Sequence, residues 1–160
     1  MDRITRWADW EKACEAEPET AAEAALIAAC RAGGSCRLGT TRPAAPSDAT
    51  RIRAPLLAYL IRGGCAGCPT TERGVWLEGA SITGALDLTG ATAQGRVGPF
   101  HCTFDTAITA QDANLAALGL DGSTLPGLDL QRAKITGPVF LRDGFHATGG
   151  VTLSGATIGG

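Results

Sequence analysis

The chemistry that this sequence could carry begins with its six cysteines. Cys65 and Cys68 form a CxxC pair, and Cys30 and Cys36 form a wider pair. Four thiolates can bind zinc tetrahedrally, but the wide pair does not have the spacing of a zinc knuckle. A redox CxxC would be expected within a βαβ pattern, which these residues lack. A metal or redox module on these four residues is therefore an alternative, and we expect reduced thiols.

The two histidines give no stronger case for catalysis. His101 and His146 each lie beside a phenylalanine, and neither has a serine, cysteine or carboxylate at a spacing that defines a catalytic set. The sequence contains neither a phosphate-binding P-loop nor a GxGxxG motif after a strand. We therefore predict a protein that is not an enzyme, without catalytic, cofactor-binding or metal-binding residues.

Charge and hydropathy argue against several further classes. The formal net charge is -2 and the isoelectric point about 5.6, whereas a non-specific grip on nucleic-acid phosphates requires clustered basic residues. The N-terminal MDRITRWADWEK lacks the apolar core of a signal peptide, and the apolar run APLLAYLI is too short to span a bilayer. We expect a cytoplasmic protein that binds neither nucleic acid directly nor, in this segment, a membrane.

Residues 1–70 have a helical pattern and form the predicted N-terminal domain. In ITRWADWEKACEA, Trp7, Trp10 and Cys14 share one helical face. A second helix is expected in PETAAEAALIAACRAGG, which a glycine pair ends. A proline-rich linker then leads to a third helix in ATRIRAPLLAYLIRGG, where Pro55 either kinks the helix or marks its true start.

From about Gly74 a short unit recurs, as GVWLEGASITG, ALGLDGSTLPG, GLDLQRAKITG and GVTLSGATIGG. Its large aliphatic residues lie five apart. Five residues advance about 140° net around an α-helix, so this pattern buries no coherent helical face. Glycine and proline interrupt any single long strand. A chain that turns a corner every five residues fits the pattern, and four sides close a square coil of about twenty residues.

One complete turn of this coil extends from Leu118 to Gly137. Alternate residues on each side point inward, which predicts four inward pairs: Leu118/Leu120, Ser123/Leu125, Leu128/Leu130 and Ala133/Ile135. Residues twenty apart should stack, so Asp112 is expected to lie beside Arg132. The second predicted domain, residues 71–160, then contains about four coils, each of which contacts mainly its neighbours.

The five-residue units resemble those of the pentapeptide-repeat family, in which a small residue precedes a central aliphatic by two. They include ASITG from Ala80, ANLAA from Ala113, STLPG from Ser123, AKITG from Ala133 and ATIGG from Ala156. The resemblance covers about half the chain. It implies a right-handed quadrilateral β-helix, here with an N-terminal helical cap, and therefore an α+β fold. Some members of this family bind type II topoisomerases by imitating DNA, and some dimerise through their C-terminal coil.

The frame of the repeat slips in two stretches, which carry Phe100, Phe140 and both histidines. The interpretations are a wider coil or small bulge, or a loop that contacts a partner. Trp76 lies between the inward-facing Val75 and Leu77, so it should point outward. Its indole either packs against the N-terminal helices or forms a hot spot for a partner.

The outward-facing charges are the candidates for partner binding. From Gly74 onward the chain has seven acidic and four basic residues. We single out four carboxylates as partner-binding candidates: Asp112, Asp121, Asp129 and Asp143. Charges of this kind also occur simply as a solvated surface.

The predicted function is a non-enzymatic protein-binding scaffold of bacterial or phage type. Its sharper form is an inhibitor that blocks a nucleic-acid-handling complex by occupying the DNA site, either directed at topoisomerases or of the phage anti-defence type. The alternatives are the metal or redox module and a structural segment of a longer membrane-associated protein. The sequence stops at GATIGG in the middle of a repeat. We therefore expect either that the native chain continues or that the last coil pairs with another copy in a homodimer.

Overall fold

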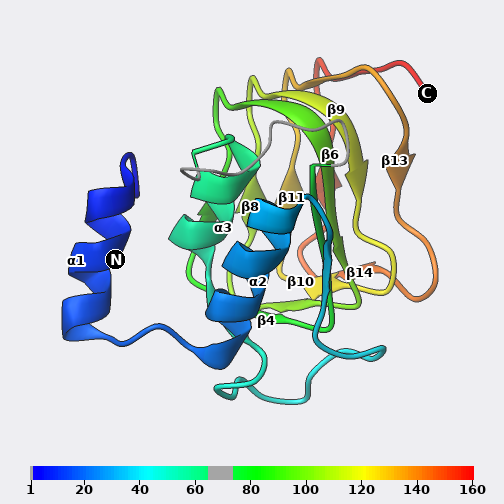
Figure 1. Cartoon of the computed structure of the whole chain (residues 1–160). Coiled ribbons are helices and arrows are strands. Elements are labelled where there is room, and N and C mark those ends of the chain that lie inside the picture. The colour runs from blue at the N-terminus through cyan, green and yellow to red at the C-terminus, as the bar shows by residue number, and fades with distance from the viewer. Residues whose placement is uncertain (1, 65–73) are drawn as a thin grey trace.

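The protein folds as three helices followed by a parallel β-solenoid of about four coils (Figure 1). The computed structural model describes residues 2–64 and 74–160. The helices are α1 Trp7–Ala16, α2 Ala21–Ala32 and α3 Ala54–Ile61. The predicted α+β fold, with a helical N-terminal part and a β-helix, is confirmed.

The solenoid strands stack into three parallel sheets. The first has the order β1 Ser35–Arg37, β3 Val75–Glu78, β6 Thr92–Phe100, β9 Asn114–Gly119, β12 Lys134–Ile135 and β16 Thr157–Ile158, and β13 Val139–Phe140 also pairs with β9. The second contains β2 Arg51–Arg53, β4 Ser81–Thr83, β7 Thr103–Phe104, β10 Thr124–Leu125 and β14 His146–Ala147. The third contains β5 Leu86–Asp87, β8 Ile108–Thr109, β11 Leu128–Asp129 and β15 Val151–Thr152. We call these sheets A, B and C.

The spacing between paired residues of successive coils is the predicted twenty in some coils and up to 23 in others. Lys134 pairs with Asn114, twenty residues earlier, and with Thr157, 23 residues later. The pairing of β6 with β9 shifts register between Ala93 and Arg96. This irregularity falls in the first stretch where the repeat frame slips, so the interpretation of that slip as a bulge or wider coil is confirmed.

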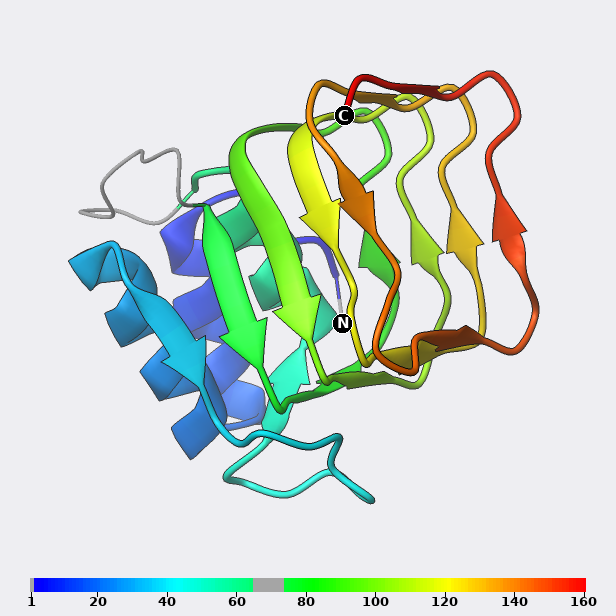
Figure 2. The ribbon, with the colours of Figure 1, turned by 90° about the vertical axis from the view of Figure 1, so that its right-hand side faces the viewer.

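The four inward pairs of the turn from Leu118 to Gly137 are confirmed, since all eight side chains are buried. All of them except Ser123 belong to one apolar core that also contains residues of α2 and α3, including Leu26, Leu56 and Leu57. Because the core is continuous, the helices and the solenoid stabilise one another. Figure 2 shows the helices at one end of the stack of coils and the C-terminal coil at the other.

Two short strands and a helix cover the N-terminal end of the solenoid. β1 pairs with β3 and β2 pairs with β4, and α3 lies against β5. The expected helical conformation before Pro55 is wrong, because Arg51–Arg53 is β2. Pro55 lies in the first turn of α3 and therefore marks the true start of that helix. β1 and β2 lie within the predicted helical domain, yet each adds an edge strand to a sheet of the solenoid.

The segment between β1 and β2, residues 38–50, lies along one side of the solenoid, where it contacts the corners of successive coils. Arg42 donates from Nη1 to the carbonyl oxygens of Gly122 and Gly144, at 2.9 and 3.2 Å. Gly79 lies under this segment with φ +78°, where an added Cβ would lie 2.6 to 2.9 Å from backbone atoms of Gly39. The corner at Gly79 therefore needs glycine for its conformation and for the close approach of Gly39.

We expect Gly79→Ala to destabilise the protein more than Gly90→Ala. Both glycines have a positive φ, but nothing lies within 4 Å of a Cβ at Gly90. Each alanine pays about 1 to 2 kcal/mol for the left-handed conformation, and only Gly79→Ala adds a steric cost of about 1 to 3 kcal/mol against backbone. Urea denaturation of the two variants measures the difference. Equal costs would contradict the close approach of residues 38–50.

Candidate protein-binding surfaces

The predicted stacking of Asp112 and Arg132 is confirmed. Arg132 donates from Nε and Nη2 to the two carboxylate oxygens of Asp112, at 2.9 and 3.0 Å. Both residues form the corner of their coil with φ near +57°. The hydrogen bonds from Arg132 hold the pKa of Asp112 below its usual range. The ion pair is exposed, so it neutralises local charge and contributes little stability.

Asp121 does not have the outward, solvated position that its place in the repeat suggests. Its carboxylate is largely buried, and it accepts hydrogen bonds from the backbone N–H of Arg142 at 2.8 Å and from Arg142 Nη2 at 2.9 Å. The arginine of the next coil covers it. A carboxylate used in this way fixes a corner of the solenoid and is not free to bind a partner.

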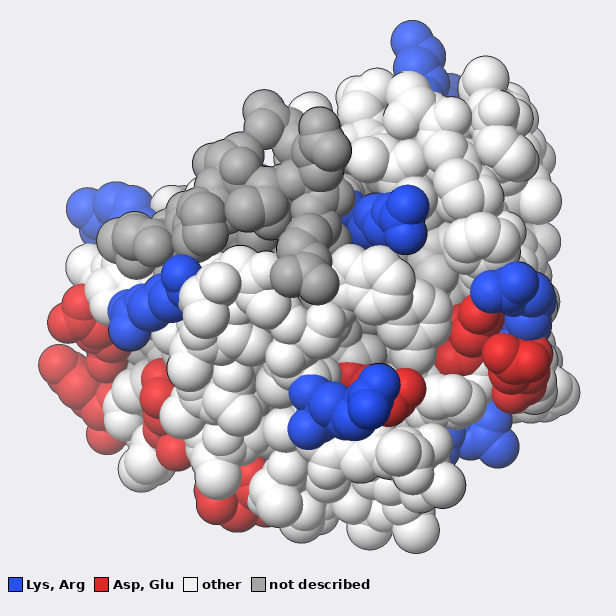
Figure 3. Space-filling view, turned by 45° about the vertical axis from the view of Figure 1, so that its right-hand side comes forward, with Lys and Arg blue, Asp and Glu red and all other residues white. Residues whose placement is uncertain are grey.

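The four candidate carboxylates do not form one acidic face. Asp129 lies at the end of β11, where its carboxylate accepts hydrogen bonds from the side chain of Gln111 and from the backbone N–H of Gln131. The structure therefore pairs Asp112 with Arg132 and Asp121 with Arg142, while Asp129 is held by glutamines and Asp143 is exposed. On the face in Figure 3, some basic groups adjoin acidic ones and others of either charge lie apart, separated by wide uncharged areas.

The C-terminal coil exposes residues of the kind that are buried in every earlier coil. Val151, Leu153 and Ile158 are 38%, 46% and 39% exposed and are the exposed large apolar residues of the described chain. Val151 pairs with Leu128 and Ile158 pairs with Ile135, and both of these earlier residues are 2% exposed. The last coil thus presents an uncovered core surface beside unpaired strand edges, which we call the open end.

A second apolar surface, on the outer side of sheet A, was not identified from the repeat. The ring of Trp76 packs on Phe100 of the next coil, with ring centroids 5.2 Å apart. Phe140 lies on the same side of the sheet, two coils beyond Phe100. The frame slips at Phe100 and Phe140 were the available signal, but the register that brings the rings together depends on the irregularity in β6.

The described cysteines are poorly suited to metal or thiolate chemistry. Burial raises the pKa of Cys30 and of Cys36 to about 11, and that of Cys102 to about 12. Within residues 2–64 and 74–160, no group of three or more histidine, cysteine or acidic side chains could hold a metal ion. Cys65 and Cys68 lie outside the described residues, so the four-cysteine alternative stays a prediction.

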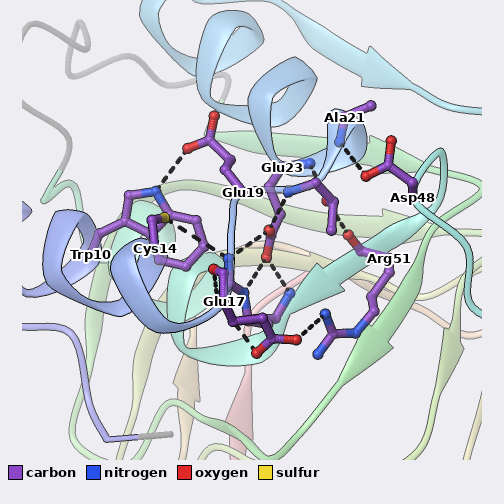
Figure 4. A network of polar contacts seen from close by, with 10 residues as sticks. Trp10, Cys14, Glu17, Glu19, Ala21, Glu23, Asp48 and Arg51 are labelled. Atoms are coloured by element: carbon purple, nitrogen blue, oxygen red, sulfur yellow. Dashed lines mark hydrogen bonds and ion pairs between the residues drawn. The ribbon is translucent and has the colours of Figure 1, made fainter.

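The most deeply buried charges join the helices to β2 (Figure 4). Arg53 donates to both carboxylate oxygens of Glu23, from Nε and Nη2 at 2.9 Å, and its guanidinium also lies 4.3 Å from the ring centroid of Trp10. Arg53 Nη1 donates to the carbonyl oxygen of Glu17 at 2.9 Å. Burial alone would raise the pKa of Glu23, but the hydrogen bonds from Arg53 and from the backbone of Thr20 outweigh it and lower that pKa. Because these internal bonds use the donors of Arg53 and the carboxylate oxygens of Glu23, the pair has a structural role.

Comparisons with known proteins identify no relative of this chain. A scan against family models, a search of curated proteins and a search of solved structures each found no match to the chain. No helix in the described part of the chain is long and apolar enough to cross a bilayer.

Proposed function

We propose that the protein is a non-enzymatic protein-binding scaffold of the pentapeptide-repeat type, and that the open end is its main binding surface. The observation that carries this proposal is the exposure of Val151, Leu153 and Ile158, which occupy core positions of the repeat. A coil that continues the pattern would cover these side chains and pair with their strand edges. Further coils of a longer native chain would supply both, and so would a protein partner, whereas a small ligand would not.

The partner that fits the open end best is a second copy of the chain. The opposite end of the solenoid is already covered by β1, β2 and α3. A head-to-tail stack of the described chains would therefore place an uncovered coil against a helical cap. Two open ends facing each other have the same width and the same apolar residues, and they give a closed dimer with twofold symmetry.

We expect Ile158→Glu to shift the protein toward monomer, because it places a charge in the apolar centre of the proposed interface. Thr157→Glu is the matched control: Thr157 is the exposed neighbour in the same two-residue strand, β16, and it alternates to the outer face. Sedimentation equilibrium at several protein concentrations measures the change. A wild-type chain that stays monomeric at all concentrations, or a control that dissociates equally, would contradict the dimer.

The DNA-mimicking inhibitor stays a prediction, but its charge basis is weak. Two of its four carboxylates, Asp112 and Asp121, are paired with arginines of the next coil. Asp112 and Asp121 also lie at opposite ends of β9, and Asp129 accepts hydrogen bonds from Gln111 and Gln131. A cytoplasmic location and a role as a segment of a longer membrane-associated protein likewise stay predictions.

A further inference from the structure

Residues 38–50, which we call the strap, contact four successive coils along one side of the solenoid. The strap is the cyan loop at the bottom of Figures 1 and 2. At the first coil, the backbone N–H of Leu38 donates to the carbonyl oxygen of Glu78 at 2.8 Å. At the second coil, the hydroxyl of Thr103 donates to the carbonyl oxygen of Pro43 at 3.2 Å. These two contacts fix the strap beside the first half of the solenoid.

Arg42 extends the contacts of the strap to the third coil and to the last. Its Nη1 donates to the carbonyl oxygens of Gly122 and Gly144, which lie at neighbouring corners of these two coils. A guanidinium donates more strongly than a neutral N–H group, because the donor is charged. One side chain thus joins two coils whose corner residues are 80 and 102 positions away in the sequence.

The other end of the strap is fastened to the helical part of the protein. The carbonyl oxygen of Asp48 accepts a hydrogen bond from the backbone N–H of Ala22 at 3.1 Å, and its carboxylate accepts one from that of Ala21 at 3.3 Å. Both N–H groups belong to the first turn of α2. The strap therefore links the helices at one end of the solenoid with the last coil at the other end.

The last coil, residues 138–160, is the least supported part of the solenoid. In the described chain its strands, β13 to β16, pair with strands of earlier coils and with no later ones. Stability in a solenoid comes from contacts between neighbouring coils, so a coil with one neighbour opens at a lower cost in free energy than a coil with two. The hydrogen bond from Arg42 to Gly144 is a contact that needs no further coil.

We propose that the strap is a conformational device that controls whether the last coil is folded. While Arg42 binds Gly144, the last coil stays docked on the third; when the strap moves away, the last coil opens while the helices and the earlier coils stay folded. The open end consists of side chains of the last coil, so the position of the strap decides whether this surface is formed. The inference deepens the proposed function, and it rests on that function only in giving the open end a partner.

Amide hydrogen exchange, followed by mass spectrometry on the full chain at low protein concentration, tests this device. In Arg42→Gln we expect peptides from residues 138–160 to exchange about three- to tenfold faster than in the wild type, the range for the net loss of one hydrogen bond. Peptides from residues 105–117, which Arg42 does not contact, should keep their rate. Equal acceleration in both regions would show that Arg42 supports the whole fold and would overturn the proposal, as would an unchanged rate in the last coil.

Arg37→Gln is the matched control. Arg37 lies just before the strap and is exposed, but its Nε binds the carboxylate of Glu78, in the first coil, at 2.9 Å. We expect this change to leave the exchange of residues 138–160 at the wild-type rate; an acceleration equal to that of Arg42→Gln would contradict a specific link to Gly144. The exchange is measured in the monomer, so the strap and the dimer are tested separately and either can fail alone.

Discussion

Replacing Glu23 with glutamine is expected to lower the free energy of unfolding by about 3 to 5 kcal/mol, because it removes the buried carboxylate that faces the guanidinium of Arg53. The half-exposed carboxylate of Glu17, 3.6 Å from Arg53 Nη1, is then the remaining counter-charge in the described part of the chain. Glu23 is fully buried and Arg53 nearly so. The carboxylate also accepts from the backbone N–H groups of Thr20 and Arg53, each at 2.9 Å. One side chain thus caps α2 and fixes the start of α3 against it. Urea denaturation followed by circular dichroism measures the loss.

Two controls separate the buried pair from charge in general. Asp112→Asn removes a carboxylate from an exposed ion pair of similar length and should have a far smaller effect. The double variant Glu23→Gln, Arg53→Met should cost less than the sum of the two single changes, because it leaves no unpaired charge. Additive costs would contradict a coupled pair.

The same pair gives the sign of a pH effect. The pKa of Glu23 is held below its ordinary value of 4.5 in the folded protein, so the folded state binds fewer protons than the unfolded state. The stabilisation is therefore complete above pH 4.5 and is lost as the pH falls below it, through the folded pKa. We expect the denaturation midpoint of the wild type to fall over that range, and Glu23→Gln to remove this part of the pH dependence.

The solenoid was predictable because the repeat can be recognised within short stretches of the sequence. A buried residue every five positions specifies where each side of the coil lies, and the ion pair between Asp112 and Arg132 follows from counting one turn. The strands β1 and β2 were not predicted, because each has only three residues. The residues of β2 were expected to belong to the third helix, which begins only after them. Ser35 pairs with Trp76, 41 residues later, and no local pattern indicates such a distance.

The sites that depend on register were the least predictable. Arg53 and Glu23 are 30 residues apart in the sequence and meet only because β2 adds to sheet B beside α2. The apolar surface on the outer side of sheet A needs Phe100 to lie over glycines of two coils, and this alignment follows the irregularity in β6. Burial of Asp121 likewise depends on where the next coil places Arg142. The last two depend on the lengths of coils, which vary by up to three residues.

Leu130→Ala should destabilise the protein by about 2 to 5 kcal/mol, the cost of a cavity in a closed core. Leu153→Ala, the same change at the matching position one coil later, should cost less than about 1 kcal/mol in the monomer. The two leucines differ in solvent exposure, since Leu130 is 0% and Leu153 is 46% exposed. The backbone N–H of Leu130 donates to the carbonyl oxygen of Thr152, the residue before Leu153. Urea denaturation at low protein concentration compares the two variants.

Raising the protein concentration turns this comparison into a test of what covers the open end. If a second copy covers Leu153, association stabilises the folded wild type by mass action. Leu153→Ala then weakens that association, so its cost should grow with concentration while that of Leu130→Ala stays constant. A cost for Leu153→Ala that equals that of Leu130→Ala even at the lowest concentration would contradict an open end. A small cost at every concentration would leave the open end exposed in solution and contradict the dimer.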